Sequence, residues 1–456
     1  MFVIMYYRDM GRSSSRHLKA MTAVDTVSRQ VRAASSIIKP LVVSAGLSVA
    51  AAVRTRRLGE KAYVGAHITD YDPLDPVTAA QPHDAYRKLH ASGRVHYNPK
   101  RSTWILSRHG DVRAALTDTD KINSTQGVTR MKFALPTIVM TDGEQHSQLR
   151  KKVQPAFTPR ALDSWTPMID ELARDLVADV LANPGCDVVQ RLAIPMPIRM
   201  ITYILGVPGR DVDKFRQWSE SAIHILDFAP NLEAATRSAK AAASVIALRR
   251  YFMDQLTSGG LKSSNTALGR LVDGNADGAM TDDDLFQFAL LLLIAGNETT
   301  TNLLGGMFDT LGRNPEQFDM IRQQPDFIPM AVEEQLRFST PIQNLYRYTV
   351  ADYTVGDVTI PTGARVMLSF GAANRDPLVY DSPDEYRADR NPRMHVAFGY
   401  GAHMCLGAPL ARLEAQAILR ELVENASQIC LEGDTTWSTN SSLRGPTHLP
   451  VRLTPA

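Results

Sequence analysis

The sequence predicts a mainly α-helical protein that also contains small β-sheets, and three observations lead to this fold class. Helical periodicity dominates between Glu144 and Arg313. Short alternating segments that are typical of strands follow Glu333. Another helical pattern occupies residues 408–423, near the carboxyl end. Helix therefore outweighs strand, and residues 63–456 are expected to form a single domain.

The first predicted elements alternate between helix and strand. Residues 83–89 have a helical pattern, residues 95–106 are typical of a hairpin that turns at Asn98, and helix resumes at residues 111–116. Residues 122–137 lack a clear period and contain Gly and Pro, so a long loop is expected. Within the helical region, breaks are expected at the following Gly-rich, Pro-rich or polar stretches: 158–159, 184–185, 195–197, 206–209 and 259–278.

Short strands are predicted beyond Glu333. Residues 353–355 and 358–360 flank the dipeptide Gly356-Asp357, and residues 365–370 alternate between apolar and less apolar side chains. These three segments are expected to form a small β meander. The stretch that follows, residues 371–397, is rich in Asp, Arg and Pro and is expected to be irregular.

Composition excludes several classes of protein. The chain has 456 residues, of which 44% are hydrophobic and 21% charged, as in ordinary soluble globular proteins. A net charge of +2 does not imply nucleic acid as a partner. Three sparse cysteines argue against a disulfide framework and favour a reducing cytoplasm. Since no run of 18 apolar residues occurs, no spanning helix is expected.

The amino-terminal residues 1–62 form a basic extension with 11 Lys+Arg against 3 Asp+Glu. Within it, residues 37–57 contain a mildly apolar stretch closed by arginines. One interpretation is an interfacial helix that makes weak contact with an anionic membrane surface. The other is a docked or frayed leader.

The stretch FGYGAHMCLG, at residues 398–407, is the most informative of the chain. It holds Cys405 among small residues, opens with Phe398 and precedes a helical pattern. Such a loop can bring backbone and one sulfur close to a flat prosthetic group. A thiolate in that position can be the axial ligand of haem iron.

A long helix is predicted over residues 282–311. Thr281 and Asp284 have the spacing of a capping box, and residues 285–294 are almost wholly apolar, as in a buried helix. Glu298 and Thr299 follow in the same predicted helix. Polar side chains are costly inside a buried helix, because each one needs a hydrogen-bond partner. Two interpretations remain open. Either the threonines bond to their own backbone at a kink, or a gap in the helical ladder holds water and relays protons.

Two further pairs have helical spacing. Glu334 and Arg337 lie three residues apart and can form an ion pair. His146 and Arg150 lie four apart and could donate together to one carboxylate. Taken singly, the first pair is explained by an ordinary surface ion pair and the second by an ordinary solvated helix face.

In combination, these motifs resemble those of the cytochrome P450 family of haem-thiolate monooxygenases. FGYGAHMCLG is similar to the haem-binding signature, and AGNETT at 295–300 is similar to the oxygen-activation motif. The other two pairs resemble the family's E-x-x-R and H-x-x-x-R. The resemblance extends from about Tyr71 to the carboxyl end and suits a bacterial member. It implies the P450 fold, with haem sandwiched between the long central helix and the helix after the Cys loop.

The resemblance also implies a role for each site residue. Cys405 would be the axial ligand of the iron of haem b, shielded by Phe398, while Glu298 and Thr299 would manage protons as O₂ is split. Glu334, Arg337 and Arg390 would form a structural triad, although Tyr386 and Ala388 replace a typical Phe and Pro beside it. A structural role is expected for His395. The haem propionates would be bound by four cationic side chains: His146, Arg150, Arg347 and His403.

The expected substrate is a hydrophobic small molecule, such as a terpenoid, steroid, fatty acid or polyketide. Its pocket would be lined by five mainly aliphatic segments, with polar points at Gln343 and Asn344: 122–137, 228–235, 291–295, 341–345 and 438–443. Electrons would come from NAD(P)H through an external ferredoxin and ferredoxin reductase. One interpretation of Lys151, Lys152 and Arg412 is a cationic patch on which these partners dock on a monomeric protein, and the other is ordinary surface charge. The alternatives are a peroxide-driven haem enzyme and a non-catalytic haem- or lipid-binding protein.

Overall fold

The computed structural model describes residues 65–130, 137–223, 232–257, 269 and 281–456. The basic extension 1–62, with its segment 37–57, lies outside the described residues, as does nearly all of the polar break 259–278. Parts of two expected pocket segments, 131–136 and 228–231, lie outside them as well.

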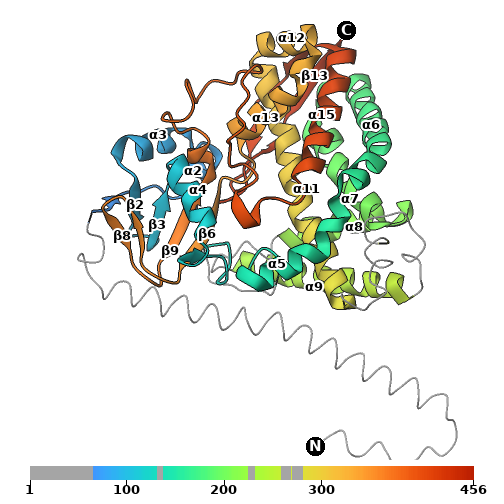
Figure 1. Ribbon diagram of the computed structural model, residues 1–456. Coiled ribbons are helices and arrows are strands. Elements are labelled where there is room, and N and C mark those ends of the chain that lie inside the picture. Colours follow the sequence, from blue (N-terminus) through green and yellow to red (C-terminus); the bar gives the residue numbers. More distant parts are fainter. Residues whose placement is uncertain (1–64, 131–136, 224–231, 258–268, 270–280) are drawn as a thin grey trace, which may run out of the picture.

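Helices make up most of the molecule; α2, α3 and α4 lie beside the larger sheet, and most of the others gather to one side of it (Figure 1). The predicted helices are confirmed, and the predicted breaks at 158–159, 184–185 and 206–209 fall between helices or at the start of one. The break expected at 195–197 is wrong, because these residues form the first turn of α7, where a proline is tolerated at the first helical positions. The helices have these bounds: α2 Pro76–Ala80, α3 His83–Ser92, α4 His109–Thr117, α5 Gly143–Val153, α6 Pro159–Ala182, α7 Pro195–Leu205, α8 Val212–Ile223, α9 Leu232–Thr257, α11 Asp282–Arg313, α12 Pro315–Gln323, α13 Ile328–Ser339, α14 Phe370–Ala373 and α15 Ala408–Asn425.

The larger sheet has six strands in the order β1-β2-β3-β9-β6-β4. The predicted hairpin is confirmed, because β2 and β3 pair antiparallel with Val95 opposite Leu106. These strands have the following bounds: β1 His67–Ile68, β2 Val95–Asn98, β3 Thr103–Leu106, β4 Ile122–Asn123, β6 Asn344–Thr349 and β9 Arg365–Ser369.

The predicted meander is wrong. β7 (Tyr353–Val355) and β8 (Val358–Ile360) form a two-stranded sheet of their own, whereas β9 joins the larger sheet between β3 and β6. Alternation identified the strands, but it carries no information on which distant strand becomes the partner.

Two smaller sheets lie near the carboxyl end. Their strands are β5 Cys186–Asp187, β10 Ala426–Leu431, β11 Thr436–Trp437, β12 Pro446–His448 and β13 Pro450–Pro455.

The long helix α11 runs through the centre of the helical side (Figure 1). Its predicted start is confirmed, since Thr281 and Asp284 form a complete capping box. Glycines allow other segments to approach it closely: a Cβ at Gly305 would lie 2.7 Å from Pro446 Cγ, and one at Gly312 would lie 2.7 Å from Leu431 Cδ2. α11 is therefore locked against β12 and β10.

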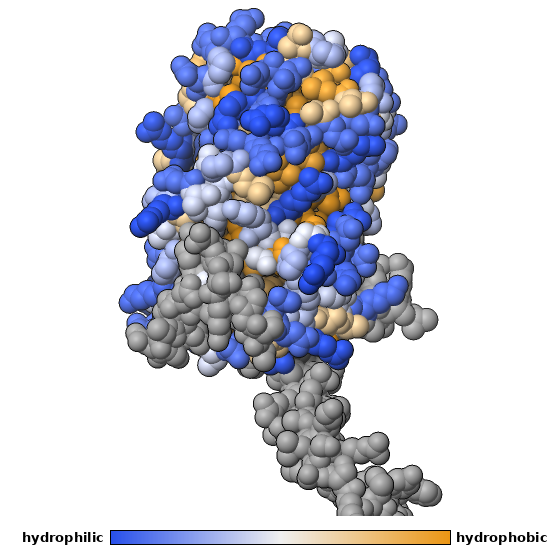
Figure 2. Space-filling model, turned by 90° about the vertical axis from the view of Figure 1, so that its right-hand side faces the viewer, coloured by the Kyte–Doolittle hydropathy of each residue, from blue (hydrophilic) through white to orange (hydrophobic). Residues whose placement is uncertain are grey.

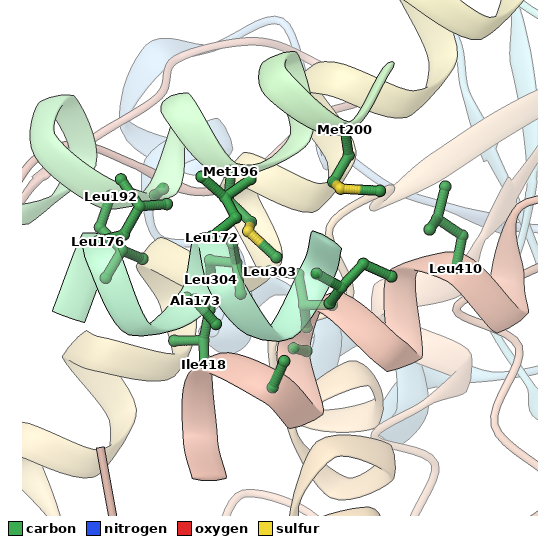
Figure 3. Close-up of a cluster of buried hydrophobic side chains, with 14 of the residues drawn as sticks. Leu172, Ala173, Leu176, Leu192, Met196, Met200, Leu303, Leu304, Leu410 and Ile418 are labelled. Carbon is green, nitrogen blue, oxygen red and sulfur yellow. The ribbon is translucent and has the colours of Figure 1, made fainter. Parts of the chain in front are cut away.

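A cluster of buried hydrophobic side chains packs α6, α7 and α15 against α11 (Figure 3). Burying a large aliphatic side chain stabilises a fold by about 1.5–3 kcal/mol, so this cluster holds α15 firmly against α6 and α11. The orientation of α15 matters because the Cys405 loop leads directly into it. The labelled members are Leu172, Ala173, Leu176, Leu192, Met196, Met200, Leu303, Leu304, Leu410 and Ile418.

The face on the right-hand side of Figure 1 is mainly hydrophilic, with hydrophobic side chains showing between the others in a broken strip (Figure 2). Within the part of the chain that the structure describes, no helix is both long enough and apolar enough to cross a membrane.

Candidate functional site

Cys405 lies between the short 3-10 helix η7 (Gly401–His403) and the first turn of α15. Its backbone N–H donates to the carbonyl of Phe398 at 2.9 Å, which closes the loop. The N–H groups of Gly407 and Ala408 donate to its sulfur. Two N–H donors at a helix N-terminus favour a negative sulfur over a neutral one.

The thiol of Cys405 is free and accessible to solvent, yet protein surrounds it closely. Desolvation raises the pKa of the thiol, and the two N–H donors together with Arg150 and Arg412 oppose that rise only in part. A positively charged ion bound at the sulfur would reverse this balance, because thiolates are the form that ligates metals.

Gly401 has a positive φ of 71°, which favours glycine. A Cβ at this position would lie 3.0 Å from the carbonyl oxygen of Leu116. The Cys loop is thus held directly against the C-terminal end of α4.

Two histidines of the predicted set meet beside this loop. The rings of His146, on α5, and His403 are 4.2 Å apart between centroids. His146 is buried, and its Nε2 has no hydrogen-bond partner among the described residues. Desolvation, followed by the charges of His403 and Arg150, lowers the pKa of His146 to about 4. Its imidazole is therefore neutral at pH 7 and can donate one hydrogen bond.

Arg347 and Arg150 complete the predicted cationic group. Arg347 is buried on β6, and desolvation lowers its pKa to about 10 while Asp142 attracts its charge. It donates from Nη1 to the carbonyl of Tyr346 at 2.9 Å. Arg150 is more exposed and donates to the carbonyl of Ala402 at 3.1 Å. A desolvated guanidinium such as that of Arg347 is well suited to bind a carboxylate.

The sequence reasoning missed Asp142, which immediately precedes α5. Its Oδ1 lies 2.8 Å from His403 Nε2, and its Oδ2 accepts from the Ser124 backbone and hydroxyl, both at 2.7 Å. Desolvation acts to raise the pKa of Asp142, but the hydrogen bonds from His403 and Ser124 outweigh it and hold the pKa below its ordinary value. Nothing in the local sequence links Asp142 to a histidine 261 positions away.

These observations agree with the donor set that haem requires. The recessed Cys405 sulfur has two N–H donors, which suits an axial thiolate. Nearby stand a buried imidazole nitrogen without a partner, on His146, and the desolvated guanidinium of Arg347. Two propionates would supply the acceptors that these buried donors lack.

Glu298 and Thr299 lie in the middle of α11, which continues unbroken across them. Thr299 Oγ1 donates to the carbonyl of Ala295, one turn earlier, at 2.7 Å. The threonine thus bonds to its own backbone, as in the first of the two interpretations. Because its hydrogen points to Ala295, the oxygen can still accept a hydrogen bond. Gly296 faces α7, where a Cβ would lie 3.1 Å from Ile201 Cδ1.

The structure brings the three members of the expected triad together. Arg337 donates from Nε and Nη2 to the two oxygens of Glu334 at 2.7 and 2.8 Å, and Arg390 Nε donates to Glu334 Oε1 at 3.0 Å. Arg337 also donates to three backbone carbonyls of the irregular segment: those of Asn374, Pro383 and Glu385. The unusual Tyr386 is accommodated because its hydroxyl donates to the carbonyl of Ala331 at 3.1 Å.

Arg412 has a different environment from the one expected. Its Nε and Nη2 donate to Glu333 at 2.5 and 2.9 Å, and its guanidinium lies 4.6 Å from the centroid of the Phe398 ring. His395 Nε2 also lies 3.0 Å from Glu333. Glu333, which the sequence reasoning missed, therefore balances the charge of Arg412. That arginine fixes Phe398 beside the Cys loop and is not a free cation of the predicted patch.

The two polar side chains expected in the pocket make internal hydrogen bonds. Gln343 accepts from the Tyr86 hydroxyl at 2.5 Å and donates to the carbonyl of Ser339 at 2.9 Å. Asn344 donates to the carbonyl of Ser441 at 2.7 Å. Leu345, by contrast, is two residues from Arg347 and so shares its face of β6.

Comparisons with known proteins agree with this geometry. A family model described as Cytochrome P450 matches residues 249–448. A Mycobacterium tuberculosis protein named beta-dihydromenaquinone-9 omega-hydroxylase is 45% identical over 417 residues, which are 91% of this chain and 85% of that protein. Cytochrome P450 130 of the same organism is 34% identical, over 83% of this chain and 96% of that protein.

Solved structures with the same fold also exist. Cytochrome P450 CYP109Q5 from Chondromyces apiculatus superimposes with a TM-score of 0.76 and 30% identity, over 85% of this chain and 98% of that one. CYP109E1 from Bacillus megaterium, solved in complex with testosterone, has a TM-score of 0.74 and 28% identity, over 82% and 99%.

Proposed function

Because the chain belongs to the cytochrome P450 family and is a P450 monooxygenase, we propose that it hydroxylates the terminal carbon of a long apolar chain in a lipid of the menaquinone class. The observation that carries this proposal is the 45% identity, across 91% of the chain, to a beta-dihydromenaquinone-9 omega-hydroxylase. Of the substrate classes considered from sequence, the proposal selects the terpenoid, since a polyprenyl chain is one.

The environment of β6 supports an apolar substrate. Gln343 and Asn344 already make hydrogen bonds within the protein, so neither is available as a polar anchor. Leu345 instead packs with Val128 and Met140. A surface of aliphatic side chains binds a hydrocarbon chain by desolvation and selects weakly among positions along it. Terminal selectivity would then depend on how deeply the chain can enter.

The proposal assigns haem b as the cofactor and Cys405 as its axial ligand. Bound haem would supply the iron chemistry by which O₂ is activated, and a thiolate ligand favours cleavage of the O–O bond. His146, Arg150, Arg347 and His403 would hold the propionates. Asp142 would orient His403, because their side chains lie 2.8 Å apart.

Thr299 and Glu298 would manage protons on the opposite side of the haem. Since Thr299 Oγ1 donates to Ala295, it can accept a hydrogen bond and so hold a proton-bearing group in place. Glu298 follows Ala295 by three positions on the same helix, and a carboxylate there can pass protons inward from solvent. The triad of Glu334, Arg337 and Arg390 would hold α13 and the irregular segment in a fixed position relative to each other.

An external ferredoxin and its reductase would supply electrons from NAD(P)H. Lys151 is exposed and remains a candidate docking cation, whereas Lys152 lies 3.8 Å from Asp284. The sparse cysteines support a cytoplasmic location, and a monomer is proposed.

The test is turnover of a panel of menaquinones and apolar chains by the haem-loaded protein with NADPH and a surrogate ferredoxin system. We expect a product one oxygen atom heavier and hydroxylated at the chain terminus, as identified by mass spectrometry. Replacing NADPH by hydrogen peroxide tests the alternative of a peroxide-driven enzyme, which would form product in this arm. Tight binding of the panel without product in either arm would favour a non-catalytic binder and contradict the proposal.

A further inference from the structure

A groove with a largely apolar lining that also contains two arginines lies between α3 and the irregular segment that follows α14, apart from the Cys405 site. It encloses about 300 Å³, which is within the range of small-molecule sites. Figure 1 shows this segment passing close to α3, and an ion pair between Arg87 and Asp384 joins the two. The lining consists of His83, Tyr86, Arg87, His90, Ala91, Arg375, Pro377, Pro383 and Asp384.

Two arginines face each other across one carboxylate in this groove. Arg375 is 5% exposed and donates from Nη1 to Asp384 Oδ1 at 2.5 Å and from Nη2 to the carbonyl of Phe338 at 2.9 Å. Arg87, which is half exposed, donates to Asp384 Oδ2 at 2.9 Å. The second partner of Arg87 is Asp84, whose side chain is 79% exposed and does not line the groove. Within the lining, two guanidinium groups therefore share one carboxylate.

The imidazole of His83 lies in the lining of the groove and is affected by three nearby arginines. Desolvation, followed by the charges of Arg375, Arg444 and Arg87, lowers the pKa of this imidazole to about 2. Arg444 is buried and does not line the groove, but its charge acts on His83. The ring is neutral at pH 7 because burial disfavours its charged form, and the charges of the three arginines add to this effect.

We propose that this groove binds a small molecule that carries an oxyanion, either a phosphate or a carboxylate, between Arg87 and Arg375. The planar fork of each guanidinium matches an oxyanion and can hold it with paired hydrogen bonds. Arg375 is buried and its Nη2 donates to the carbonyl of Phe338, so its position is fixed before binding and little side-chain entropy is lost when the ligand arrives. Pro377 and Pro383 provide an apolar wall for the body of the ligand.

The proposal is tested with the full-length, haem-loaded protein. The unfolding midpoint is followed as inorganic phosphate or, in a separate series, benzoate replaces sodium chloride at constant ionic strength. Because a ligand of the folded state raises the midpoint in a saturable way, the half-saturation concentration measures affinity. We expect saturation with at least one of the two probes, and the probe that saturates identifies the oxyanion.

Three substitutions test whether Arg87 favours binding of the oxyanion and whether Asp384 opposes it. Arg87→Gln is expected to raise the half-saturation concentration about two- to fivefold, as removal of one partly exposed charge should. Asp384→Asn removes the competing carboxylate and is expected to lower it by a similar factor. Arg191→Gln is the control, since Arg191 is similarly exposed and pairs with Asp179 elsewhere.

The half-saturation concentration is compared within each variant, so a lower starting midpoint in Asp384→Asn does not affect it. A rise in midpoint that is linear in concentration and equal in all four proteins would show only a general salt effect and overturn the proposal. Weaker binding in Asp384→Asn would overturn it as well.

Discussion

Glu334 and Arg337 lie three residues apart on α13, both side chains are fully buried, and two hydrogen bonds of 2.7 and 2.8 Å join them. Arg390 adds a third bond to the same carboxylate. Glu334→Gln would leave the fully buried guanidinium of Arg337 and the partly buried guanidinium of Arg390 without a counter-ion. We expect a loss of about 3–5 kcal/mol in the free energy of unfolding, measured with urea.

Asp170→Asn is the matched control for this substitution. Asp170 pairs with Arg420 at 2.9 Å, but both side chains are partly exposed. Breaking such a pair should cost less than about 1 kcal/mol. Equal effects of the two substitutions would contradict the distinction between a buried and a surface pair.

Asp142 is expected to control how tightly the protein retains haem. It fixes His403, whose ring lies against that of His146. Asp142→Ala should speed the loss of haem to an excess of an apo-globin scavenger by roughly tenfold, as removal of an orienting partner commonly does. Asp142→Asn keeps a hydrogen-bond acceptor and should have a smaller effect. Asp179→Ala, at a surface pair, should not change the rate.

The carboxylate of Asp142 is also expected to make the stability of the protein depend on pH. Hydrogen bonds from His403 and Ser124 hold the pKa of Asp142 below its ordinary value of 3.8 in spite of desolvation. The contribution of Asp142 to stability is therefore complete above pH 3.8 and is lost as the pH falls through the lower folded-state pKa. In acid titrations of unfolding, Asp142→Asn should flatten this part of the curve.

Thr299→Ala is expected to uncouple electron consumption from product formation. Without the hydroxyl that bonds to Ala295, protons should no longer be delivered in an ordered way, and reducing equivalents should form hydrogen peroxide. Product per NADPH should fall by about tenfold or more, measured beside peroxide release. Thr166→Ala removes the same kind of threonine-to-backbone bond from α6 and should leave the ratio unchanged. An unchanged ratio in Thr299→Ala would remove the proposed proton role.

Local chemistry explains which parts of the fold could be predicted. α11 begins at Asp282 as predicted, because the capping box that precedes it is read from four consecutive residues. The pairing of β9 with β3 could not be predicted in this way, since β3 lies about 260 positions away in the chain. Only three-dimensional pairing could exclude the meander.

The candidate site, too, could be predicted from sequence only where its residues lie close together in the chain. Spacing placed Glu334 and Arg337 on one helix face, where the structure has them. It could not identify Asp142 or Glu333, because a carboxylate beside a glycine or a second glutamate has no distinguishing pattern. Their importance arises from His403 and Arg412, which reach them from distant segments.

Glu414 has an unusual position on α15 that leads to the last prediction. Its side chain is 2% exposed, and its Oε2 has no hydrogen-bond partner among the described residues. It lies four residues from both Leu410 and Ile418, two members of the buried cluster of Figure 3. Desolvation raises the pKa of Glu414 to about 8, so the folded protein holds this carboxyl in its neutral form at pH 7.

The sign of the resulting pH dependence follows from the two pKa values. In the unfolded chain the carboxyl ionises above an ordinary pKa of 4.5, whereas in the folded protein it stays protonated up to about 8. The folded state therefore binds more protons between these values, and stability falls as the pH rises through this window. The slope attributable to one proton is at most about 1.4 kcal/mol per pH unit.

Glu414→Gln should remove this slope, because glutamine has nearly the same shape and does not ionise. We expect the free energy of unfolding of the variant to decline less than that of the parent protein between pH 5.5 and 7.5, measured with urea at each pH. Glu421→Gln, on the same helix, is the control for a change of helix charge. If parent and Glu414→Gln proteins lose stability in parallel, then Glu414 is ionised in the folded state and a partner compensates its charge.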